Sequence, residues 1–249
     1  MTKIILSGAN GKMGKVIQDV VSSRNDCEIV AGVDLNTESK SFPIYSSISE
    51  VKEIGDVVID FSNPVVLDSL LAYSKENKTP LVIATTGFDE NQKSLIKESA
   101  KVCPIFFTYN MSMGINLLAT LAKKAVSVLG SDFDIEIIEK HHNQKIDAPS
   151  GTALMLADAI CEEIDNPMTY EYDRHSKREK RSKNEIGLHA VRGGTIVGEH
   201  DIMFCGRDEI ITLSHSARSK EIFAVGAVNA AIYMTGKSAG LYDMAEMIK

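Results

Sequence analysis

Short apolar runs alternate with helical patterns along the first half of the chain. Each run is bounded by turn-forming residues and fits a strand buried in a parallel sheet, and the runs lie at residues 3–7, 27–33, 57–61, 81–84 and 105–107. Between the first two runs, apolar positions recur every three or four residues, at Met13, Val16, Ile17, Val20 and Val21. This alternation of strands and helices predicts a mostly parallel sheet.

Cap residues mark the start of two of these helices. Asn63 and Pro64 precede the helix that follows the third predicted strand, and proline is favoured at the first position of a helix. Asp89 precedes the next helix and is a favoured N-cap. Both positions are therefore predicted helix starts.

The pattern changes after Met113. The first elements expected there are a long helix, a strand and a second helix, at residues 115–129, 133–139 and 152–164. Residues 167–184 are charged and poorly periodic, and within them residues 174–183 are expected to be a solvated surface segment. Three strands and a final helix follow, at residues 186–191, 195–205, 209–215 and 221–235. Because no helix separates these strands, they are expected to pair in an antiparallel or mixed sheet.

A glycine-rich turn joins the first strand to the first helix. Gly8, Gly11 and Gly14 form a variant of the dinucleotide fingerprint, in which Asn10 stands where the second glycine usually lies. Asparagine tolerates positive φ better than most residues, so the turn remains feasible. Asp34 follows Gly14 by 20 residues, at the end of the second strand, where a carboxylate would bind an adenosine ribose. The turn predicts a dinucleotide site, and the alternative is a structural glycine turn without a ligand.

The choice between NAD and NADP stays open on these residues. Asp34 favours a free 2′-hydroxyl, whereas Lys12 would attract a 2′-phosphate. Two further segments, residues 84–87 and 108–111, follow predicted strands at the edge where open α/β sheets bind ligands. They are expected to line the nicotinamide side, and ordinary strand-to-helix turns are the alternative for each.

Residues 141–153 hold the chain's densest group of chemically useful side chains. His141 and His142 are histidines, which titrate near neutral pH, and Lys145 supplies a positive charge and a proton. Residues 150–152 fit a helix N-terminus, where free N–H groups favour a carboxylate or phosphate. The alternative for the first of these residues is an N-cap without further role. A base, a cation and an anion site within a dozen residues indicate catalysis.

A metal site is disfavoured in the same segment. Adjacent histidines at a strand end point to opposite sides, so His141 and His142 would not converge on one ion. No cluster of acids or cysteines completes a ligand set. We therefore expect no metal.

Composition narrows the class of protein. The 249 residues suffice for two domains, and the net charge of −7 argues against broad binding to nucleic-acid backbones. Nothing resembles the roughly 18 consecutive apolar residues of a membrane span, and no secretory signal precedes the first strand. The four cysteines lie far apart without a C-x-x-C pair. A cytoplasmic enzyme that binds no membrane or nucleic acid is therefore expected.

The polar segment also identifies a family. It reads Glu139-Lys140-His141-His142-Asn143-Gln144-Lys145-Ile146-Asp147-Ala148-Pro149-Ser150-Gly151-Thr152-Ala153 and resembles the signature of the dihydrodipicolinate (4-hydroxy-tetrahydrodipicolinate) reductases. The similarity runs almost the whole chain and includes the glycine turn, Val197-Gly198-Glu199-His200 and the C-terminal Gly236-Lys237-Ser238-Ala239-Gly240-Leu241-Tyr242-Asp243. The resemblance implies reduction of a cyclic dicarboxylate imine, or its hydrated form, by NADH or NADPH in diaminopimelate and lysine biosynthesis.

The resemblance also implies roles for individual residues. His141 is similar to the family's catalytic histidine and Lys145 to its proton donor. The positions similar to substrate-binding residues are His142, Ser150, Gly151 and Thr152. The positions similar to cofactor-binding residues are Gly8, Ala9, Asn10, Gly11, Lys12, Met13, Asp34, Ala84, Thr85, Thr86, Thr108, Tyr109, Asn110 and Met111.

The implied fold is α/β, with a Rossmann-like dinucleotide-binding domain over residues 1–112. An α+β substrate-binding and oligomerisation domain with a mixed sheet covers residues 113–220. Residues 221–249 are expected to return to the first domain. The resemblance further implies a homotetramer built through the C-terminal sheet.

Three positions depart from the family pattern. Ala84 replaces a usual glycine, so the backbone there is less free to approach the cofactor. Lys220 replaces a frequent arginine, and lysine lacks the bidentate fork that holds a carboxylate. Leu35 and Asn36 follow Asp34 where some relatives carry an arginine for a 2′-phosphate, which favours NADH slightly, with use of both cofactors expected.

Two rival functions remain on the sequence. A semialdehyde dehydrogenase acting through a thiohemiacetal needs a cysteine beside a base, and none of the four cysteines lies in residues 141–153. A non-catalytic NAD(P)-binding sensor would keep the glycine turn but would need no pair of His141 and Lys145.

Overall fold

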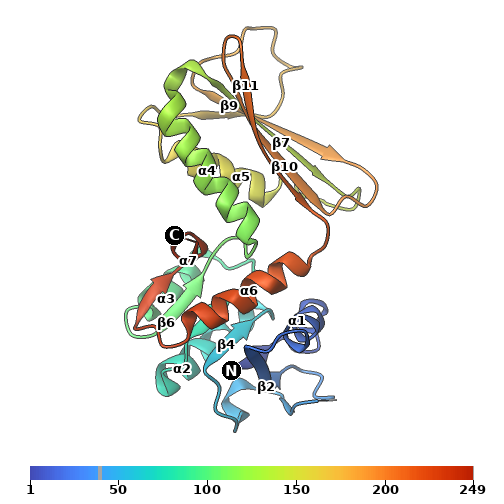
Figure 1. The fold of residues 1–249 in the computed structure, drawn as a ribbon, viewed down its shortest axis with the longest axis vertical. Coiled ribbons are helices and arrows are strands. Elements are labelled where there is room, and N and C mark those ends of the chain that lie inside the picture. Colours follow the sequence, from blue (N-terminus) through green and yellow to red (C-terminus); the bar gives the residue numbers. More distant parts are fainter. Residues whose placement is uncertain (39–40, 249) are drawn as a thin grey trace. The chain divides into compact units, whose positions relative to one another are not determined.

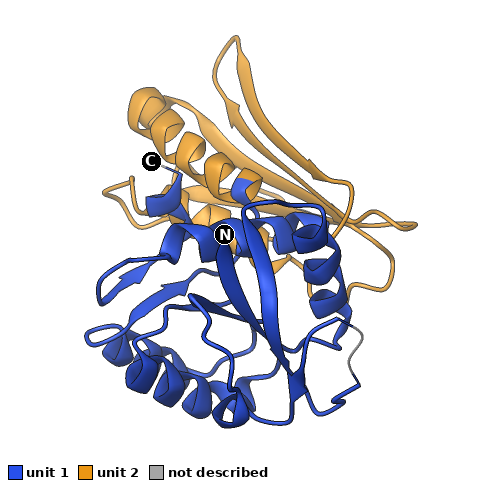
Figure 2. Ribbon diagram, turned by 60° about the horizontal axis from the view of Figure 1, so that its bottom comes forward, with its two compact units in different colours: residues 1–113, 221–249 blue, residues 114–220 orange. Residues whose placement is uncertain are grey.

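The computed structural model describes residues 1–38 and 41–248. They divide into two compact units (Figure 2). Unit 1 comprises Met1–Met113 and Glu221–Lys249, and unit 2 comprises Gly114–Lys220. The last part of the chain therefore belongs to the same unit as the N-terminus.

Unit 1 is built on a seven-stranded parallel sheet in the order β12-β6-β5-β4-β1-β2-β3 (Figure 1). Its strands are β1 (Thr2–Ser7), β2 (Cys27–Val33), β3 (Ile44–Tyr45), β4 (Val57–Asp60), β5 (Leu81–Ile83), β6 (Pro104–Phe107) and β12 (Gly240–Tyr242). Its α-helices are α1 (Lys12–Ser22), α2 (Leu67–Asn77), α3 (Glu90–Ser99), α6 (Glu221–Met234) and α7 (Met244–Met247). Two short 3₁₀ helices complete it, η1 (Ile48–Glu50) and η2 (Pro64–Val66).

Alternate strand residues of this sheet pack into two separate cores. Ile4 and Ile59 point to the face that α1 and α6 cover, whereas Ile5 and Val58 point to the face that α2 and α3 cover. Burial on both faces explains why these strands are continuous apolar runs rather than alternating ones. The predicted Rossmann-like parallel sheet is confirmed.

Local differences from the predicted elements have local causes. β3 and β12 escaped prediction because runs of two and three residues carry no periodicity, and both lie at the edges of the sheet. Asn63 does cap a helix, since its side chain accepts the N–H of Val65, but that helix is the 3₁₀ turn η2 before α2. Asp89 forms a full capping box with Gln92, as predicted for a helix start.

Unit 2 has a five-stranded mixed sheet in the order β11-β10-β7-β9-β8. Its strands are β7 (Asp134–His141), β8 (Thr169–Glu171), β9 (Glu185–Arg192), β10 (Gly198–Cys205) and β11 (Ile210–Ala217). β7 pairs antiparallel with β10 and parallel with β9, which confirms the predicted mixed sheet. Its helices are α4 (Met113–Leu129), η3 (Gly130–Asp132) and α5 (Gly151–Cys161), and α4 and α5 pack on one face of the sheet (Figure 1).

One expectation for this unit is corrected, and one is confirmed with a single exception. β10 begins at Gly198 rather than at residue 195, because Gly194, at φ +49°, forms a turn there. The charged stretch contains β8 at its start, and residues 174–183 after it are exposed as expected, except that the Arg181 side chain is only 17% exposed. The Arg181 guanidinium binds the carboxylates of Asp134 and Glu136. Charge patterning carried no signal for this docking, because the partners lie on a distant strand.

Among the described helices, Met113–Asp132 alone has a length and mean hydropathy, 1.2, that would suffice for a membrane span. Core helices of water-soluble proteins meet the same two criteria. Ile115, Leu118 and Ala122 of this helix lie in the core of unit 2. The suitability of Met113–Asp132 for a membrane span is therefore a statement about its length and composition only.

Candidate active site

The glycine turn of unit 1 is shaped so that side chains are excluded. Gly8 has φ +81°, and a Cβ on it would lie 2.5 Å from the carbonyl oxygen of Phe61. A Cβ on Gly14 would lie 2.1 Å from the carbonyl oxygen of Gly8, whereas one on Gly11 would lie 3.2 Å from it. Gly11 is the N-cap of α1 without a side-chain cap among the described residues, so the first N–H groups of the helix face outward. This bare helix start fits a dinucleotide phosphate.

Asp34 and Asn10 fasten this turn to the end of β2. The Asp34 carboxylate accepts the backbone N–H of Asn10 at 2.9 Å and that of Asn36 at 3.0 Å. The Asn10 amide donates to the carbonyl oxygens of Asn36 and Glu38 at 2.6 and 3.0 Å. The structure therefore brings Asp34 beside the turn, and the asparagine at the second-glycine position has a bonding role that the sequence did not indicate.

A buried acid lies beneath the neighbouring strand ends. Asp60, 1% exposed at the end of β4, accepts the Ser62 hydroxyl at 2.5 Å, and the hydroxyls of Ser7 and Thr85 also bind it. Burial raises the pKa of Asp60, and these three hydrogen bonds oppose the rise. Thr85 Oγ1 also accepts the N–H of Ser62 at 2.8 Å. Thr85 is thus directed into the protein, while Thr86 is exposed.

The other predicted cofactor segment contains both buried and exposed residues. Tyr109 is exposed and packs its ring against Phe107, with centroids 6.1 Å apart. Met111 is buried under α6, where a Cβ on Gly226 would lie 1.7 Å from the Met111 carbonyl oxygen. The Asn110 side-chain oxygen accepts the N–H of Ser112 at 2.8 Å. Lys12 is exposed, Met13 is half-buried, and Ala9 and Ala84 are buried.

In unit 2, β7 carries the catalytic candidates on its buried face. Strand alternation places Ile135, Ile137, Glu139 and His141 on the same side. The apolar pair packs against α4 and α5, and the polar pair continues the same face toward the strand end. Glu139 is 0% exposed and His141 9%. A buried polar cluster thus continues the hydrophobic core.

Glu139 is the centre of this cluster. Its carboxylate lies 2.6 Å from His141 Nδ1 and accepts the backbone N–H of Ser150 at 2.9 Å. Both of its oxygens accept bonds from the Arg192 guanidinium, at 2.7 and 2.8 Å. Burial by itself raises the pKa of Glu139, but the hydrogen bonds from Arg192, His141 and Ser150 together lower it. The carboxylate is therefore ionised.

His200, on β10, is the neutral member of the cluster. Ser150 Oγ accepts the N–H of Ala153 at 3.1 Å as the N-cap of α5. The hydroxyl hydrogen is then free to be donated to His200 Nε2, 3.1 Å away. Burial and, less strongly, the charge of His141 lower the pKa of His200 to about 4. The His200 and His141 rings meet edge to face, with centroids 5.3 Å apart.

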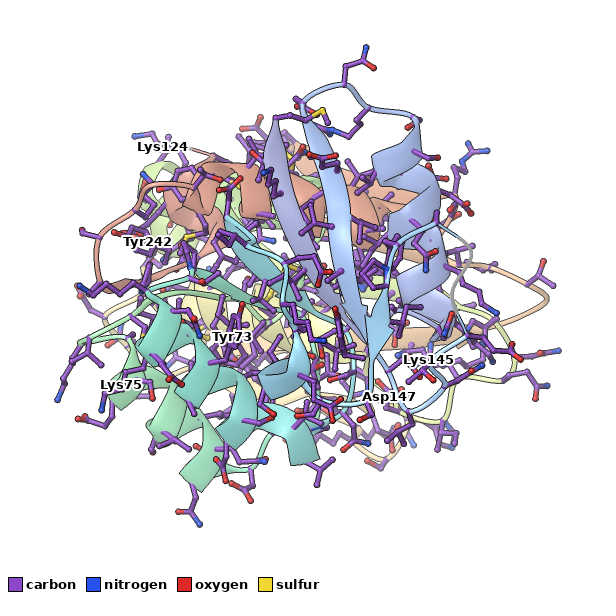
Figure 3. The ribbon with its side chains drawn as sticks, turned by 90° about the horizontal axis from the view of Figure 1, so that it is seen from below. Tyr73, Lys75, Lys124, Lys145, Asp147 and Tyr242 are labelled. Atoms are coloured by element: carbon purple, nitrogen blue, oxygen red, sulfur yellow. The ribbon has the colours of Figure 1, made fainter. Side chains whose placement is uncertain are left out.

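Next to the predicted anion site at the start of α5, Lys145 pairs with a carboxylate of the chain itself. Lys145 Nζ lies 2.9 Å from an oxygen of Asp147 (Figure 3). The Lys145 bond, together with the backbone N–H of Gly151, lowers the pKa of Asp147 despite partial burial. Open space surrounds the position that a Cβ on Gly151 would take. Lys145 therefore pairs with Asp147 close to the N-terminus of α5, whose Gly151 N–H contributes least to the lowered pKa.

The remaining candidates lie around this segment. His142 is half-buried, and its carbonyl oxygen accepts the N–H of Lys145 at 3.2 Å. Thr152 is half-buried in the first turn of α5, and Lys220 is exposed after β11. In the part of the chain that the structure describes, no three His, Cys, Asp or Glu side chains group to hold a metal ion.

The sequence did not indicate Glu139, Arg192 or His200 as members of the site, although the first and last occur in the family-like segments. One signal was available for Glu139: it lies two residues before His141 on a predicted strand, so both side chains point to the same face.

The cysteines do not form a nucleophilic site. Burial raises the pKa of Cys27, Cys161 and Cys205, the reverse of what a thiolate nucleophile requires.

Comparison with known proteins supports the same family. The N-terminal model of dihydrodipicolinate reductases matches residues 2–111, and the C-terminal model matches residues 114–248. The chain is 52% identical to 4-hydroxy-tetrahydrodipicolinate reductase of Caldanaerobacter subterraneus subsp. tengcongensis over 249 residues, all of this chain and 99% of that relative. It is 51% identical to the enzyme of the same name from Clostridium novyi, over all of this chain and 99% of that relative.

A solved structure agrees with these sequence matches. The dipicolinate-bound dihydrodipicolinate reductase from Paenisporosarcina sp. TG-14 superposes with a TM-score of 0.81 at 26% identity. The superposition covers 98% of this chain and 97% of that one. With the glycine turn and the polar cluster both in place, the chain belongs to the dihydrodipicolinate reductase family.

Proposed function

We propose that this chain reduces 4-hydroxy-tetrahydrodipicolinate to tetrahydrodipicolinate with NADH or NADPH, in diaminopimelate and lysine biosynthesis. The observation that carries the proposal is end-to-end similarity to curated reductases of that name, at 52% and 51% identity. The site geometry supports it, because unit 1 offers a dinucleotide cradle and unit 2 offers a cationic, proton-bearing cluster.

Unit 1 is assigned the cofactor. The bare N-terminus of α1 would bind the pyrophosphate, since Gly8 and Gly14 let the backbone approach without a Cβ in the way. Asp34 would accept hydrogen bonds from the adenosine ribose. The other cofactor positions assigned from the family are Ala9, Asn10, Gly11, Lys12, Met13, Ala84, Thr85, Thr86, Thr108, Tyr109, Asn110 and Met111.

Unit 2 is assigned the dicarboxylate substrate. The pairing of Lys145 with the Asp147 carboxylate supports this assignment, because the same ammonium would suit a substrate carboxylate. A substrate carboxylate would take the same donors, with Ser150, Gly151 and Thr152 at the helix start and His142 beside it. The structure of the relative from Paenisporosarcina contains dipicolinate, a dicarboxylate of the same class.

The hydroxyl of the 4-hydroxy substrate leaves as water to give the conjugated imine, and the reduction then requires a hydride and a proton. NADH or NADPH supplies the hydride when bound. Negative charge then develops on the conjugated substrate, and the Lys145 ammonium at Nζ is assigned to neutralise it by giving a proton. The His141 imidazole is assigned to exchange protons through Nε2, because its Nδ1 is bonded to Glu139.

We further propose that the protein acts in the cytoplasm as a homotetramer and binds neither nucleic acid nor membranes. The net charge of −7 supports the lack of nucleic-acid binding. Both α4 and α5 pack on one face of the unit 2 sheet, which leaves the face carrying Ile138 and Met203 for contacts between subunits.

The direct test is a coupled assay that follows the loss of absorbance at 340 nm. Aspartate semialdehyde, pyruvate and the preceding synthase supply the substrate. We expect His141→Gln and Lys145→Ala to lower kcat by about 10²–10⁴-fold while NADH binding is kept.

His175→Gln and Lys124→Ala are matched controls, because both side chains are exposed and lie outside the cluster. A folded wild-type protein that binds NADH without turnover would contradict the reductase and favour a sensor. Near-wild-type turnover of either cluster variant would remove that residue from the mechanism.

A further inference from the structure

The trio of glutamate, histidine and arginine occurs twice on β7. On the buried face, Glu139 binds His141 and Arg192. On the opposite face, Glu136 lies 2.7 Å from His189 Nε2 and accepts a bond from Arg181 Nε at 3.0 Å. The same residue types therefore sit on two sides of one strand, in different surroundings.

We propose that Glu139, held by Arg192, is a positioning residue that keeps the proton of neutral His141 on Nδ1 and thereby presents Nε2 to the reaction. This inference rests on the proposed function for the role of His141 in catalysis. It concerns only this glutamate, because, among the described residues, the hydrogen bonds of Glu136 go to His189 and Arg181 rather than to the residues around Glu139.

The tautomer follows from the charge of the acceptor. An ionised carboxylate has no proton to give, so the ring nitrogen 2.6 Å from it must be the donor. Nδ1 therefore carries a hydrogen in every protonation state of the ring, and proton exchange is confined to Nε2. An adjacent carboxylate that sets the tautomer of a catalytic histidine is a recurrent arrangement in enzymes.

The ring is also fixed in orientation. The edge-to-face contact with His200 restricts rotation of the imidazole. At the start of β10, a Cβ on Gly198 would lie 3.1 Å from His141 Nε2, so the glycine leaves room at the reactive nitrogen. Nε2 is thus held beside a strand end that carries no side chain.

Arg192 connects this positioning to the lysine. Its guanidinium binds both oxygens of Glu139 and also donates to the carbonyl oxygen of Asp147 at 2.6 Å. Asp147 in turn pairs with Lys145. Arg192 therefore contacts both the carboxylate that positions the histidine and the segment that carries the lysine.

The two trios differ in burial, which predicts different sensitivity. The side chains of Glu139 and His141 are 1% and 11% exposed, against 20% and 42% for Glu136 and His189. Water can replace a lost carboxylate near His189 but not near His141. Glu136→Gln is therefore the matched control for Glu139→Gln.

The experiment compares these two variants in kinetics and in ¹⁵N NMR of the histidine rings. In Glu139→Gln the amide oxygen is expected at the Oε1 position, which faces both Arg192 and the fixed N–H of Ser150. The NH₂ group then faces His141 and moves the ring proton to Nε2. We expect kcat to fall at least about tenfold with KM for NADH unchanged, and the His141 signals to show the Nε2–H tautomer. Glu136→Gln is expected to alter neither.

A double variant separates positioning from general structure. Adding Glu139→Gln to His141→Gln is expected to cause no further loss of kcat, because the glutamate acts through the ring that is already gone. An equal further loss in that background would overturn the proposal. An Nδ1–H tautomer in Glu139→Gln, or kcat within about threefold of the wild type, would overturn it too.

Two safeguards keep the test decisive. If Glu139→Gln does not fold, Glu139→Asp keeps the charge opposite Arg192 but withdraws the carboxylate from Nδ1, and the same changes are expected in smaller degree. Unchanged kcat in that variant would contradict the proposal. The tautomer is measured without substrate. The NMR result can therefore be interpreted even if the proposed reductase activity is not found.

Discussion

Each unit buries a carboxylate at the end of a central strand, but the two are held in different ways. Asp60, at the end of β4 in unit 1, is surrounded by the hydroxyls of Ser7, Ser62 and Thr85. Glu139, near the end of β7 in unit 2, is bonded to the Arg192 guanidinium, a histidine and a backbone N–H. Burial is nearly complete at both, with 1% and 0% exposure.

The partners decide the charge of each acid. Burial raises the pKa of Asp60, and hydroxyl donors alone do not reverse the rise. The guanidinium beside Glu139 supplies a full positive charge, and the pKa there is lowered. Burial of an acid therefore does not define its role. In unit 1 an acid with a raised pKa binds hydroxyls at or just after three strand ends, whereas in unit 2 an acid with a lowered pKa binds a histidine.

The largest effect that tests this contrast is on stability at neutral pH. Glu139→Gln leaves the Arg192 charge without a counter-ion, and we expect the free energy of unfolding to fall by about 3–5 kcal/mol. Asp60→Asn keeps the shape of an acid that burial already favours in its neutral form, so we expect a change of less than about 1 kcal/mol. Denaturant unfolding of both variants measures this difference.

Similar losses in the two variants would contradict this contrast, because they would mean that the loss of a buried carboxylate costs the same whether a guanidinium or hydroxyls surround it. Glu136→Gln serves as a control for the loss of a partly exposed ion pair, for which a loss of up to about 1 kcal/mol is expected.

The pH dependence should have opposite signs at the two acids. The lowered pKa of Glu139 contributes stability that is present above the unfolded value of about 4.3 and is lost as the pH falls through the folded pKa. The raised pKa of Asp60 does not change the free energy of unfolding below the unfolded value of about 3.9. Above that value it lowers the free energy of unfolding, until the pH has passed the folded pKa.

We therefore expect the deficit of Glu139→Gln relative to the wild type to shrink on acidification. Asp60→Asn should gain relative to the wild type as the pH rises from about 4 toward neutrality. Unfolding free energies measured at several pH values give both differences. Curves of the same sign for the two variants would contradict the assignment.

Effects smaller than that of Glu139→Gln concern the serine beside each acid. Asp60 is bound by the hydroxyl of Ser62, whereas Glu139 is bound by the backbone N–H of Ser150, which survives substitution by alanine. Ser62→Ala should cost about 1 kcal/mol through the bond to Asp60. Ser150→Ala should cost about 1 kcal/mol through the lost cap of α5.

A sharper readout than stability separates the two serines. Ser150→Ala should leave the His141 tautomer on Nδ1–H, because Glu139 keeps its three partners. A shift of that tautomer in Ser150→Ala would show that the hydroxyl, rather than the carboxylate, positions the ring.

Much of the fold could be predicted because its signals are local. The apolar runs gave β2 within its observed bounds, Asp89 and Ser150 are the caps that their positions indicated, and the glycine spacing located the turn before α1. Period, caps and positive φ depend on a few consecutive residues, so they can be recognised in a single chain.

Only part of the candidate site could be predicted from such local signals. His141, Lys145 and the start of α5 lie within a dozen residues, and the segment identified the family. Arg192 belongs to the site because β7 and β9 pair in a register that places His141 opposite Arg192. His200 belongs to the site because β10, which pairs antiparallel with β7, places it opposite Glu139. No spacing along the chain predicts such neighbours.

The sequence by itself thus determined the elements, the glycine turn and the residues that carry protons. The tertiary structure decided which buried acid receives a cation and which receives hydroxyls, since Glu139 and Arg192 are 53 residues apart in the chain. The physical reason is that the charge of a buried acid depends on groups within hydrogen-bond distance. Strand register, which is settled only on folding, brings those groups together.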